Sequence, residues 1–150
     1  MSEKQKILIV DDDKNICTAL SLILEDEGYE VDTAETGREA LDKTNSKIYN
    51  VILLDFRLPD TEGTQLLLRI KDTVPKMRKI MLTGFPSMSN AVDSVNFGAD
   101  AFVVKPCETS DLICKIREQL KKQEEEYQYS QQKVAEYIET QFRNSAELKQ

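Results

Sequence analysis

The sequence predicts an α/β domain of the flavodoxin-like class: a doubly wound, five-stranded parallel sheet in the order 2-1-3-4-5, with five helices, the last of them extended. Three observations favour this class. Short runs of Ile, Leu and Val alternate along the chain with segments of helical periodicity. Most of these runs are continuous rather than alternating, which is typical of strands covered on both faces. The connections are short, so right-handed crossovers should place helices on both faces of one sheet.

The elements follow in a regular order. Strands are expected at residues 7–10, 30–34, 51–54, 79–82 and 101–104. The first helix should begin near Lys14, because Asp13 is a suitable N-terminal cap. Gly28 and Gly98 follow the first and fourth helical segments, where glycine tolerates a left-handed helix end. Pro75 lies where the third helix is expected to end.

The composition changes after about Glu118. All five glycines and all four prolines precede that residue, and the remainder is rich in Gln, Glu and Lys. Such residues favour helix, and no helix breaker interrupts them. We therefore assign residues 1–118 to the α/β domain and residues 119–150 to a charged helical extension, with the fifth helix running well into residues 118–140.

A series of apolar residues at alternating steps of three and four runs from the end of the α/β domain into the extension. Gln123 and Ser130 interrupt this series, whose members are Ile113, Ile116, Leu120, Tyr127, Val134 and Tyr137. Two interpretations remain open. The helix is either solvated, packing intermittently on its own domain or fraying, or it forms a weak coiled coil in a homodimer.

Charge and composition exclude several classes of protein. The formal net charge of -7 disfavours direct binding to nucleic acid and to anionic membranes. No apolar run approaches the roughly 20 residues of a membrane span, and no signal peptide is evident, so a cytoplasmic location is expected. The chain has no histidine, and its three cysteines contain no Cys-x-x-Cys pair. Any chemistry must therefore depend on carboxylates, hydroxyls and lysines.

Polar side chains follow four of the five expected strands. Asp11 and Asp12 follow the first strand, Asp55 the third, Thr83 the fourth and Lys105 the fifth. In the predicted sheet the first and third strands are neighbours at the point where the strand order reverses, so three carboxylates should share one crevice. Any one of these residues alone has an ordinary structural explanation, but their joint placement at one edge does not.

Such a cluster requires positive charge. Two carboxylates about 4 Å apart repel by about 4 kcal/mol at an effective dielectric constant of about 20. A shallow site made only of oxygen ligands suits Mg2+ better than Ca2+. A carboxylate nucleophile, a divalent cation, a lysine and a hydroxyl together meet the requirements of an aspartyl-phosphate site.

At these residues the sequence resembles the receiver domain of two-component response regulators, over roughly residues 5–120. The resemblance includes the acidic pair Asp11 and Asp12, Asp55, Thr83, and the Lys105-Pro106 pair at matching spacing. The chain thus looks like a stand-alone receiver with a helical extension, although a piece of a longer regulator would look the same.

The resemblance implies a role for each matching residue. Asp55 would accept a phosphoryl group from a sensor histidine kinase or a phosphotransfer protein. Asp12, Asp55 and the backbone carbonyl of Arg57 would coordinate Mg2+, with Asp11 acting mainly through water. Lys105 and Thr83 would hold phosphoryl oxygens.

The resemblance also implies a switch. Thr83 and Phe102 would couple phosphorylation to a change in binding of a downstream protein target, although Phe102 could instead be a plain core aromatic. Arg57 and Phe85, two residues after the acceptor and the threonine, would slow hydrolysis by their bulk. The chain would then be a phosphoacceptor and not an enzyme acting on a separate substrate.

Two other functions are compatible with part of this pattern. A haloacid-dehalogenase-like phosphohydrolase also forms an aspartyl phosphate, but it needs a second aspartate two residues after the nucleophile, where this chain has Arg57. A receiver fold that acts as an interaction module without phosphorylation remains an alternative, although the complete set of site residues argues against it.

Overall fold

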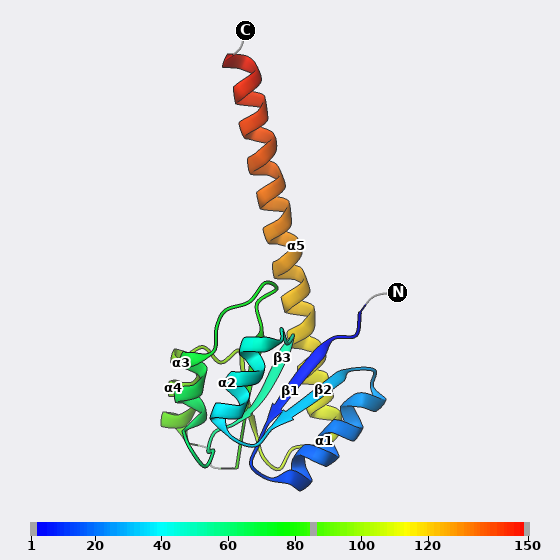
Figure 1. Cartoon of the computed structure of the whole chain (residues 1–150), viewed down its shortest axis with the longest axis vertical. Coiled ribbons are helices and arrows are strands. Elements are labelled where there is room, and N and C mark those ends of the chain that lie inside the picture. Colours follow the sequence, from blue (N-terminus) through cyan, green and yellow to red (C-terminus); the bar gives the residue numbers. More distant parts are fainter. Residues whose placement is uncertain (1–2, 85–86, 149–150) are drawn as a thin grey trace.

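A five-stranded parallel sheet forms the centre of the domain in the computed structural model, which describes residues 3–84 and 87–148 (Figure 1). The strand order is β2-β1-β3-β4-β5. The strands are β1 (Lys6–Val10), β2 (Glu30–Ala34), β3 (Val51–Asp55), β4 (Arg78–Thr83) and β5 (Ala101–Val104). The predicted fold class, strand order and all five strands are therefore confirmed, with ends that differ by one residue at most.

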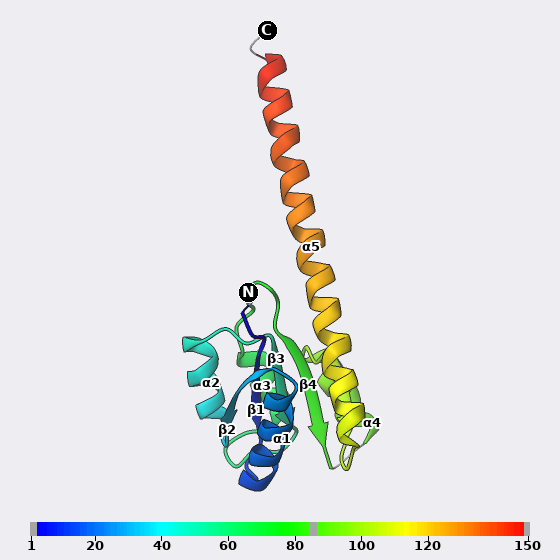
Figure 2. The same cartoon turned by 90° about the vertical axis from the view of Figure 1, so that its right-hand side faces the viewer.

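Helices cover both faces of this sheet. They are α1 (Lys14–Asp26), α2 (Gly37–Ser46), α3 (Gly63–Arg69), α4 (Met88–Asn96) and α5 (Thr109–Leu148). The helices α1 and α5 lie on one face, and α2 and α3 lie on the other (Figure 2). None of the helices in the described ranges is both long enough and apolar enough to cross a membrane.

The ends of most helices follow from local sequence. The carboxylate of Asp13 accepts hydrogen bonds from the backbone N–H groups of Asn15 and Ile16, which caps α1 as expected. Gly28 and Gly98 have φ angles of 100° and 104°, a conformation that side chains with a Cβ rarely adopt. The expected end of the third helix at Pro75 is wrong: α3 ends at Arg69, because Ile70 is already extended.

Two apolar clusters, one on each face of the sheet, form the core. Alternate residues of β1 show the division, since Ile7 and Ile9 face α1 and α5 while Leu8 and Val10 face α2 and α3. The strands β1 and β3 are almost completely buried, in agreement with their continuous apolar sequences. The sheet is thus a rigid base for the loops at the carboxyl ends of its strands.

The helix α5 is 40 residues long and extends far beyond the sheet (Figures 1 and 2). Its N-terminal part packs on the domain through Leu112, Ile116 and Leu120. The expectation that the fifth helix continues through residues 118–140 is confirmed. From Glu124 onwards almost every residue whose burial is described is exposed.

A polar cluster fastens α5 to the start of β4. The guanidinium group of Arg78, which is only 7% exposed, donates to the side chains of Gln119 and Glu126 and lies 3.6 Å from Asp100. Three charged or polar partners thus satisfy one buried cation, which makes its burial tolerable.

Gln123 also attaches α5 to the domain. Its side-chain N–H groups donate to the backbone carbonyls of Asn50 and Lys76, and its carbonyl accepts from the Asn50 side chain. Gln123 is therefore a buried contact within the chain and not a polar interruption of a seam between two chains. The interpretation in which the helix packs on its own domain is therefore correct as far along α5 as Gln123.

Gly63, the first residue of α3, has no room for a side chain. A Cβ at this position would overlap the backbone carbonyl oxygen of Asp55 and crowd the backbone of Phe56. We expect Gly63→Ala to lower the free energy of unfolding by about 1 to 3 kcal/mol, as overpacking against backbone does. Urea denaturation measures this, with Gly84→Ala as the control because its Cβ would meet open space. Equal stability of the two variants would contradict the expectation.

Candidate functional site

The candidate site lies at the carboxyl edge of the sheet, where the ends of four strands meet. Asp11 and Asp12 follow β1, Asp55 ends β3, Thr83 ends β4, and Lys105 follows β5. The pairing of β1 with β3 places Val10 beside Leu54, so the residues that follow these two are adjacent. The sheet order thus brings together the polar residues that the sequence predicted to meet.

Three carboxylates gather at the centre of this edge. One oxygen from each of Asp11, Asp12 and Asp55 lies within 4.8 Å of the others. Asp11 is buried, Asp55 is half-buried and Asp12 is exposed, so the cluster is open on one side. An all-oxygen donor set with an open side suits a hard divalent cation that keeps several of its own waters.

Lys105 is the cation nearest to these carboxylates. Its Nζ donates to Asp11 Oδ2 at 2.7 Å and lies 3.8 Å from Asp55 Oδ2. The second oxygen of Asp11 accepts the backbone N–H of Asp13 at 2.9 Å, so this buried carboxylate has partners on both oxygens. Lys105 therefore lies within reach of any group that Asp55 carries.

The environment of Asp55 disfavours its ionised form. Burial raises the pKa of this carboxyl group, the positive charge of Lys105 opposes that increase, and the negative charge of Asp11 adds to it. Burial, the largest single influence, lowers the pKa of Lys105, but the hydrogen bond to Asp11 and the negative charges of the three carboxylates together raise this pKa above its usual range. Lys105 is thus charged at neutral pH, and the raised pKa of Asp55 means that further positive charge near this carboxyl group would favour its ionised form.

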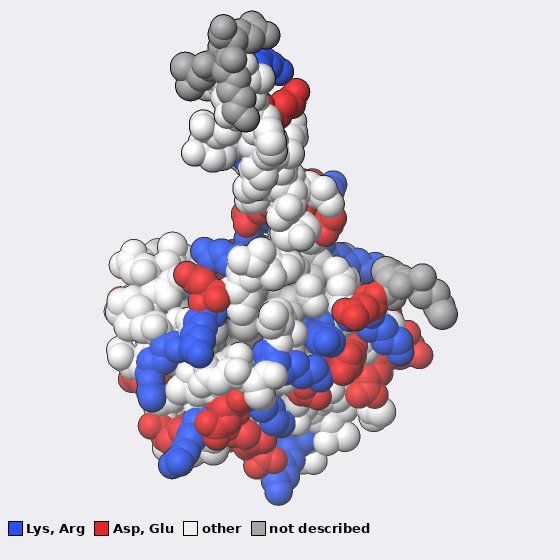
Figure 3. Space-filling model, turned by 45° about the horizontal axis from the view of Figure 1, so that its top comes forward, with Lys and Arg blue, Asp and Glu red and all other residues white. Residues whose placement is uncertain are grey.

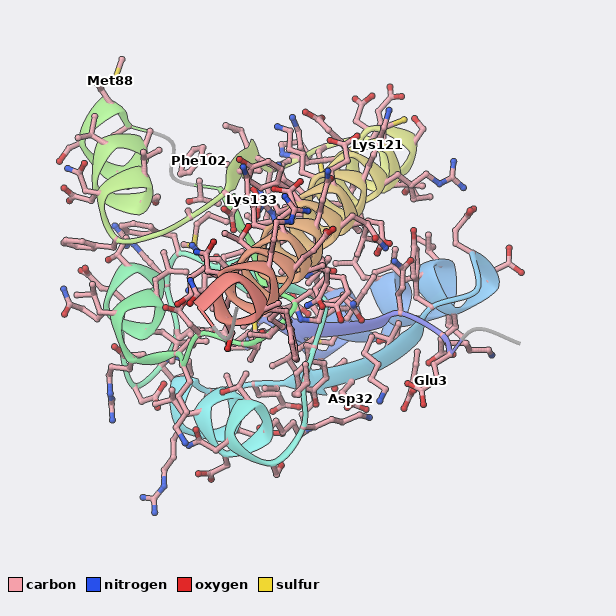
Figure 4. All side chains as sticks on the ribbon, turned by 90° about the horizontal axis from the view of Figure 1, so that it is seen from above. Glu3, Asp32, Met88, Phe102, Lys121 and Lys133 are labelled. Atoms are coloured by element: carbon pink, nitrogen blue, oxygen red, sulfur yellow. The ribbon has the colours of Figure 1, made fainter. Side chains whose placement is uncertain are left out.

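Thr83 and Phe102 lie next to this centre. Thr83 is fully buried, and its backbone carbonyl accepts the N–H of Lys105 at 2.7 Å, which links the ends of β4 and β5. Phe102 pairs with Met81 in the sheet and is partly buried against the core on the α2 and α3 face. In Figure 4 Phe102 lies on the side of the sheet near α4, opposite the edge that carries Asp32.

Cys17 lies beneath the site but has no nucleophilic character. Its thiol donates to the backbone carbonyl of Asp11 at 3.3 Å. Burial, followed by the charge of Asp11, raises the pKa of this thiol to about 11, so it is protonated at neutral pH. Its contribution is to hold the loop that carries the acidic pair.

Arg57 and Phe85 were also predicted to act at the site. Arg57 is in the loop after β3, where its backbone pairs with that of Glu62 and its N–H hydrogen bonds to Asp55. Phe85 lies outside the described residues. Sequence reasoning missed Gly63, whose close approach to the Asp55 backbone supports the acceptor strand. A glycine at the start of a helix was the only signal.

A groove beside the site was also missed. It has a volume of about 610 Å3 and is lined by residues of α1 and of the start of α5, and by Lys105. Most of its walls are apolar and include Ile16, Leu20, Ile23 and Leu112. The three residues from α1 are partly exposed in the groove, whereas Leu112, from α5, is buried.

Comparison with known proteins identifies relatives of this arrangement. Residues 7–117 match the family described as response regulator receiver domain. The chain is 38% identical over 119 residues to an uncharacterized transcriptional regulatory protein, YkoG, of Bacillus subtilis, covering 79% of this chain and 52% of that protein. It is 33% identical to the transcriptional regulatory protein ZraR of Klebsiella oxytoca, covering 79% of this chain and 27% of that protein. The chain thus spans about half the length of these relatives or less.

Solved structures agree with this assignment. A CheY-like receiver domain from Methanospirillum hungatei is 48% identical, with a TM-score of 0.79 over 83% of this chain and 99% of that one. The beryllofluoride-activated NtrC4 receiver domain dimer is 36% identical, with a TM-score of 0.73 over 79% of this chain and 98% of that one.

Proposed function

The chain belongs to the family of response regulator receiver domains, and from this we propose that it is a phosphorylatable switch of a two-component system. The observation that carries the proposal is the meeting of Asp11, Asp12, Asp55 and Lys105 at one open edge of the sheet. An interaction module that is never phosphorylated would not require three carboxylates and a lysine to converge at one open edge.

In the proposed reaction Asp55 is the nucleophile. A carboxylate oxygen forms a bond to the phosphorus of the donor, and the phosphorus–nitrogen bond of a phosphohistidine breaks, with its electron pair leaving on the imidazole. Bound Mg2+, held by Asp12, Asp55 and the Arg57 carbonyl with Asp11 acting through water, would neutralise phosphoryl charge. Lys105 and Thr83 would donate to the remaining phosphoryl oxygens.

The donor would be a sensor histidine kinase or a phosphotransfer protein in the cytoplasm. The apolar groove between α1 and α5 supports this partner, because it adjoins Lys105 and offers a surface to an apolar helix. Phosphorylation would change the binding of the chain to a downstream protein. The chain would then catalyse only its own phosphorylation and dephosphorylation.

The experiment that tests the proposal is incubation with acetyl phosphate and Mg2+, followed by measurement of the intact mass. We expect the addition of one phosphoryl group, and none when a chelator is present. A chain that stays unmodified while correctly folded, or that is labelled equally with the chelator, would refute the proposal.

Mg2+ alone is expected to stabilise the folded chain. A ligand at 100 times its dissociation constant raises the free energy of unfolding by about 2.7 kcal/mol, and an increase in Tm reports this gain. Asp55→Asn removes one proposed ligand, so we expect its Tm to respond much less. Equal responses of the two proteins, or no response of the wild type, would contradict this.

The raised pKa of Asp55 makes the difference in stability between the wild type and Asp55→Asn depend on pH. Because folding raises this pKa, the group's contribution to stability is present at acid pH and is lost as the pH rises through the folded-state value. Without metal, Asp55→Asn should therefore be more stable than the wild type at pH 7, and this difference should vanish at acid pH.

Thr83 is expected to affect the switch more than the chemistry. One hydrogen bond to a charged group contributes about 1.5 to 3 kcal/mol, whereas moving a population from 1:99 to 99:1 takes about 5.5 kcal/mol. Thr83→Ala should therefore still be phosphorylated but should shift only partly to the active state. NMR spectra recorded with and without phosphodonor measure this. A shift as complete as that of the wild type would remove Thr83 from the coupling.

A further inference from the structure

The outer part of α5 carries an apolar stripe that nothing in the described structure covers. Its members are Val134, Tyr137, Ile138 and Phe142, which are 53%, 66%, 49% and 74% exposed. Together with Gln141 and Ser145, three of them also line a shallow hollow. In Figure 3 much of the visible surface of the protruding helix is uncharged, with Lys, Arg, Asp and Glu at its margins.

This stripe continues the helix face that packs on the domain. The buried residues Leu112, Ile116, Leu120 and Gln123 follow one another at steps of three and four. The same steps continue through Tyr127 to the stripe, so both parts face the same side of α5. The domain covers this face only as far as the contact between Glu126 and Arg78.

A free helix of this length lacks the support that helices normally have. Residues 127–148 span about 33 Å, at about 1.5 Å per residue. Isolated helices are marginal in water, and most helices in proteins are stabilised by packing of an apolar face. An exposed apolar face on such a helix therefore requires a partner surface.

We propose that the stripe pairs with the stripe of a second copy of this chain in an antiparallel helix dimer. The contact would be two-fold symmetric, with its axis between Tyr137 and Ile138. In that arrangement Val134 lies opposite Gln141 of the other copy, and the two pairs of Tyr137 and Ile138 meet at the centre. The centre of the stripe thus faces the same centre in the other copy, while Phe142 lies opposite Lys133, whose long aliphatic side chain can cover the ring.

The domain's own position requires the antiparallel orientation. In a parallel pair with the helices about 8–10 Å apart, the partner's helix would run along the face that the first domain already covers with Leu112, Ile116 and Leu120. In the antiparallel pair the partner's Glu126 lies beyond Leu148, so each domain lies past the end of the described helix of the other copy. The domains, which carry the same sign of charge, are then far apart.

Charges on the extension are compatible with this contact. Glu136, Glu139 and Arg143 lie on the side away from the stripe, where Arg143 pairs with Glu139 at 3.2 Å and Lys133 with Glu136 at 3.9 Å. Gln131, Ala135 and Asn144 border the stripe together with Lys133, which lies one turn before Tyr137. A second copy therefore meets no row of like charges.

Sedimentation of the full chain without phosphodonor tests the contact. We expect a dimer for the wild type. For Ile138→Glu we expect a dissociation constant at least about tenfold higher, because each dimer would bury two unpaired carboxylates. The matched control is Tyr129→Glu, which makes the same kind of change at an exposed position on the opposite side. A monomeric wild type, or equal effects of the two substitutions with helix content unchanged by circular dichroism, would overturn the proposal.

Cross-linking tests the orientation. Single variants Val134→Cys and Gln141→Cys are prepared with Cys107 and Cys114, the two cysteines that are not buried, replaced by serine. An antiparallel pair predicts disulfide-linked dimers in an equimolar mixture of the two variants and not with either variant alone. Efficient cross-linking of each variant with itself would show parallel pairing and overturn the proposal. Neither experiment uses Asp55 or Mg2+, so its outcome is independent of the proposed phosphorylation.

Discussion

Asp55→Asn is expected to abolish phosphorylation by acetyl phosphate. The side-chain amide of asparagine is a poor nucleophile, and no other carboxylate lies both beside Lys105 and at the open side of the cluster, within the described ranges. Asp11 is also beside Lys105, but it is buried, and both of its oxygens already accept hydrogen bonds. The expected effect is a complete loss of incorporated phosphoryl group, measured as intact mass.

The matched control is Asp60→Asn, which makes the same chemical change outside the site. The carboxylate of Asp60 accepts the backbone N–H groups of Gly37 and Arg38, at the start of α2. This variant should be labelled to the same extent as the wild type. Labelling of Asp55→Asn at the level of the control would show that another residue is the acceptor.

Arg78→Ala is expected to be the most destabilising single change at the junction of α5 with the sheet. Removing one partner of a buried ionic cluster typically costs about 3 to 5 kcal/mol, because the remaining charge is left buried without its partner. Here Asp100, whose side chain is 18% exposed, would keep its charge with only the backbone N–H of Lys79 as a described donor. Urea denaturation measures the loss in the free energy of unfolding.

Glu126→Ala provides the comparison for Arg78. It removes the other end of the same ion pair, but the Glu126 side chain is more than half exposed. Exposed ion pairs contribute about 0 to 1 kcal/mol, so this variant should lose correspondingly little stability. If the two substitutions had equal effects, the burial of Arg78 would not be the source of its contribution.

The fold could be predicted because its main determinants are periodic in the sequence. Strands covered on both faces read as continuous apolar runs, as at Val51 to Leu54, and helices show spacing of three and four. Helix caps are equally local, which is why Asp13, Gly28 and Gly98 were placed correctly. The end of α3 was missed because proline marks a limit to a helix and does not require the helix to reach it.

The meeting of the candidate site residues could be predicted for a different reason. Parallel strands end at a common edge, so residues far apart in sequence, such as Asp11 and Lys105, meet there. No comparable rule predicts the contacts of α5 with the domain. The spacing places Gln123 on the apolar face of α5, but it does not identify the partners of Gln123 and Arg78 across this junction, which lie more than 40 positions away in the sequence.

The most direct test of the proposed phosphoacceptor is to locate the phosphoryl group itself. The chain is treated with acetyl phosphate and Mg2+, the acyl phosphate is reduced with borohydride, and the modified position is identified by peptide mass spectrometry. The expected result is one reduced residue, at position 55. Modification at Asp11, Asp12 or any other residue, or no modification of the folded chain, would contradict the assignment.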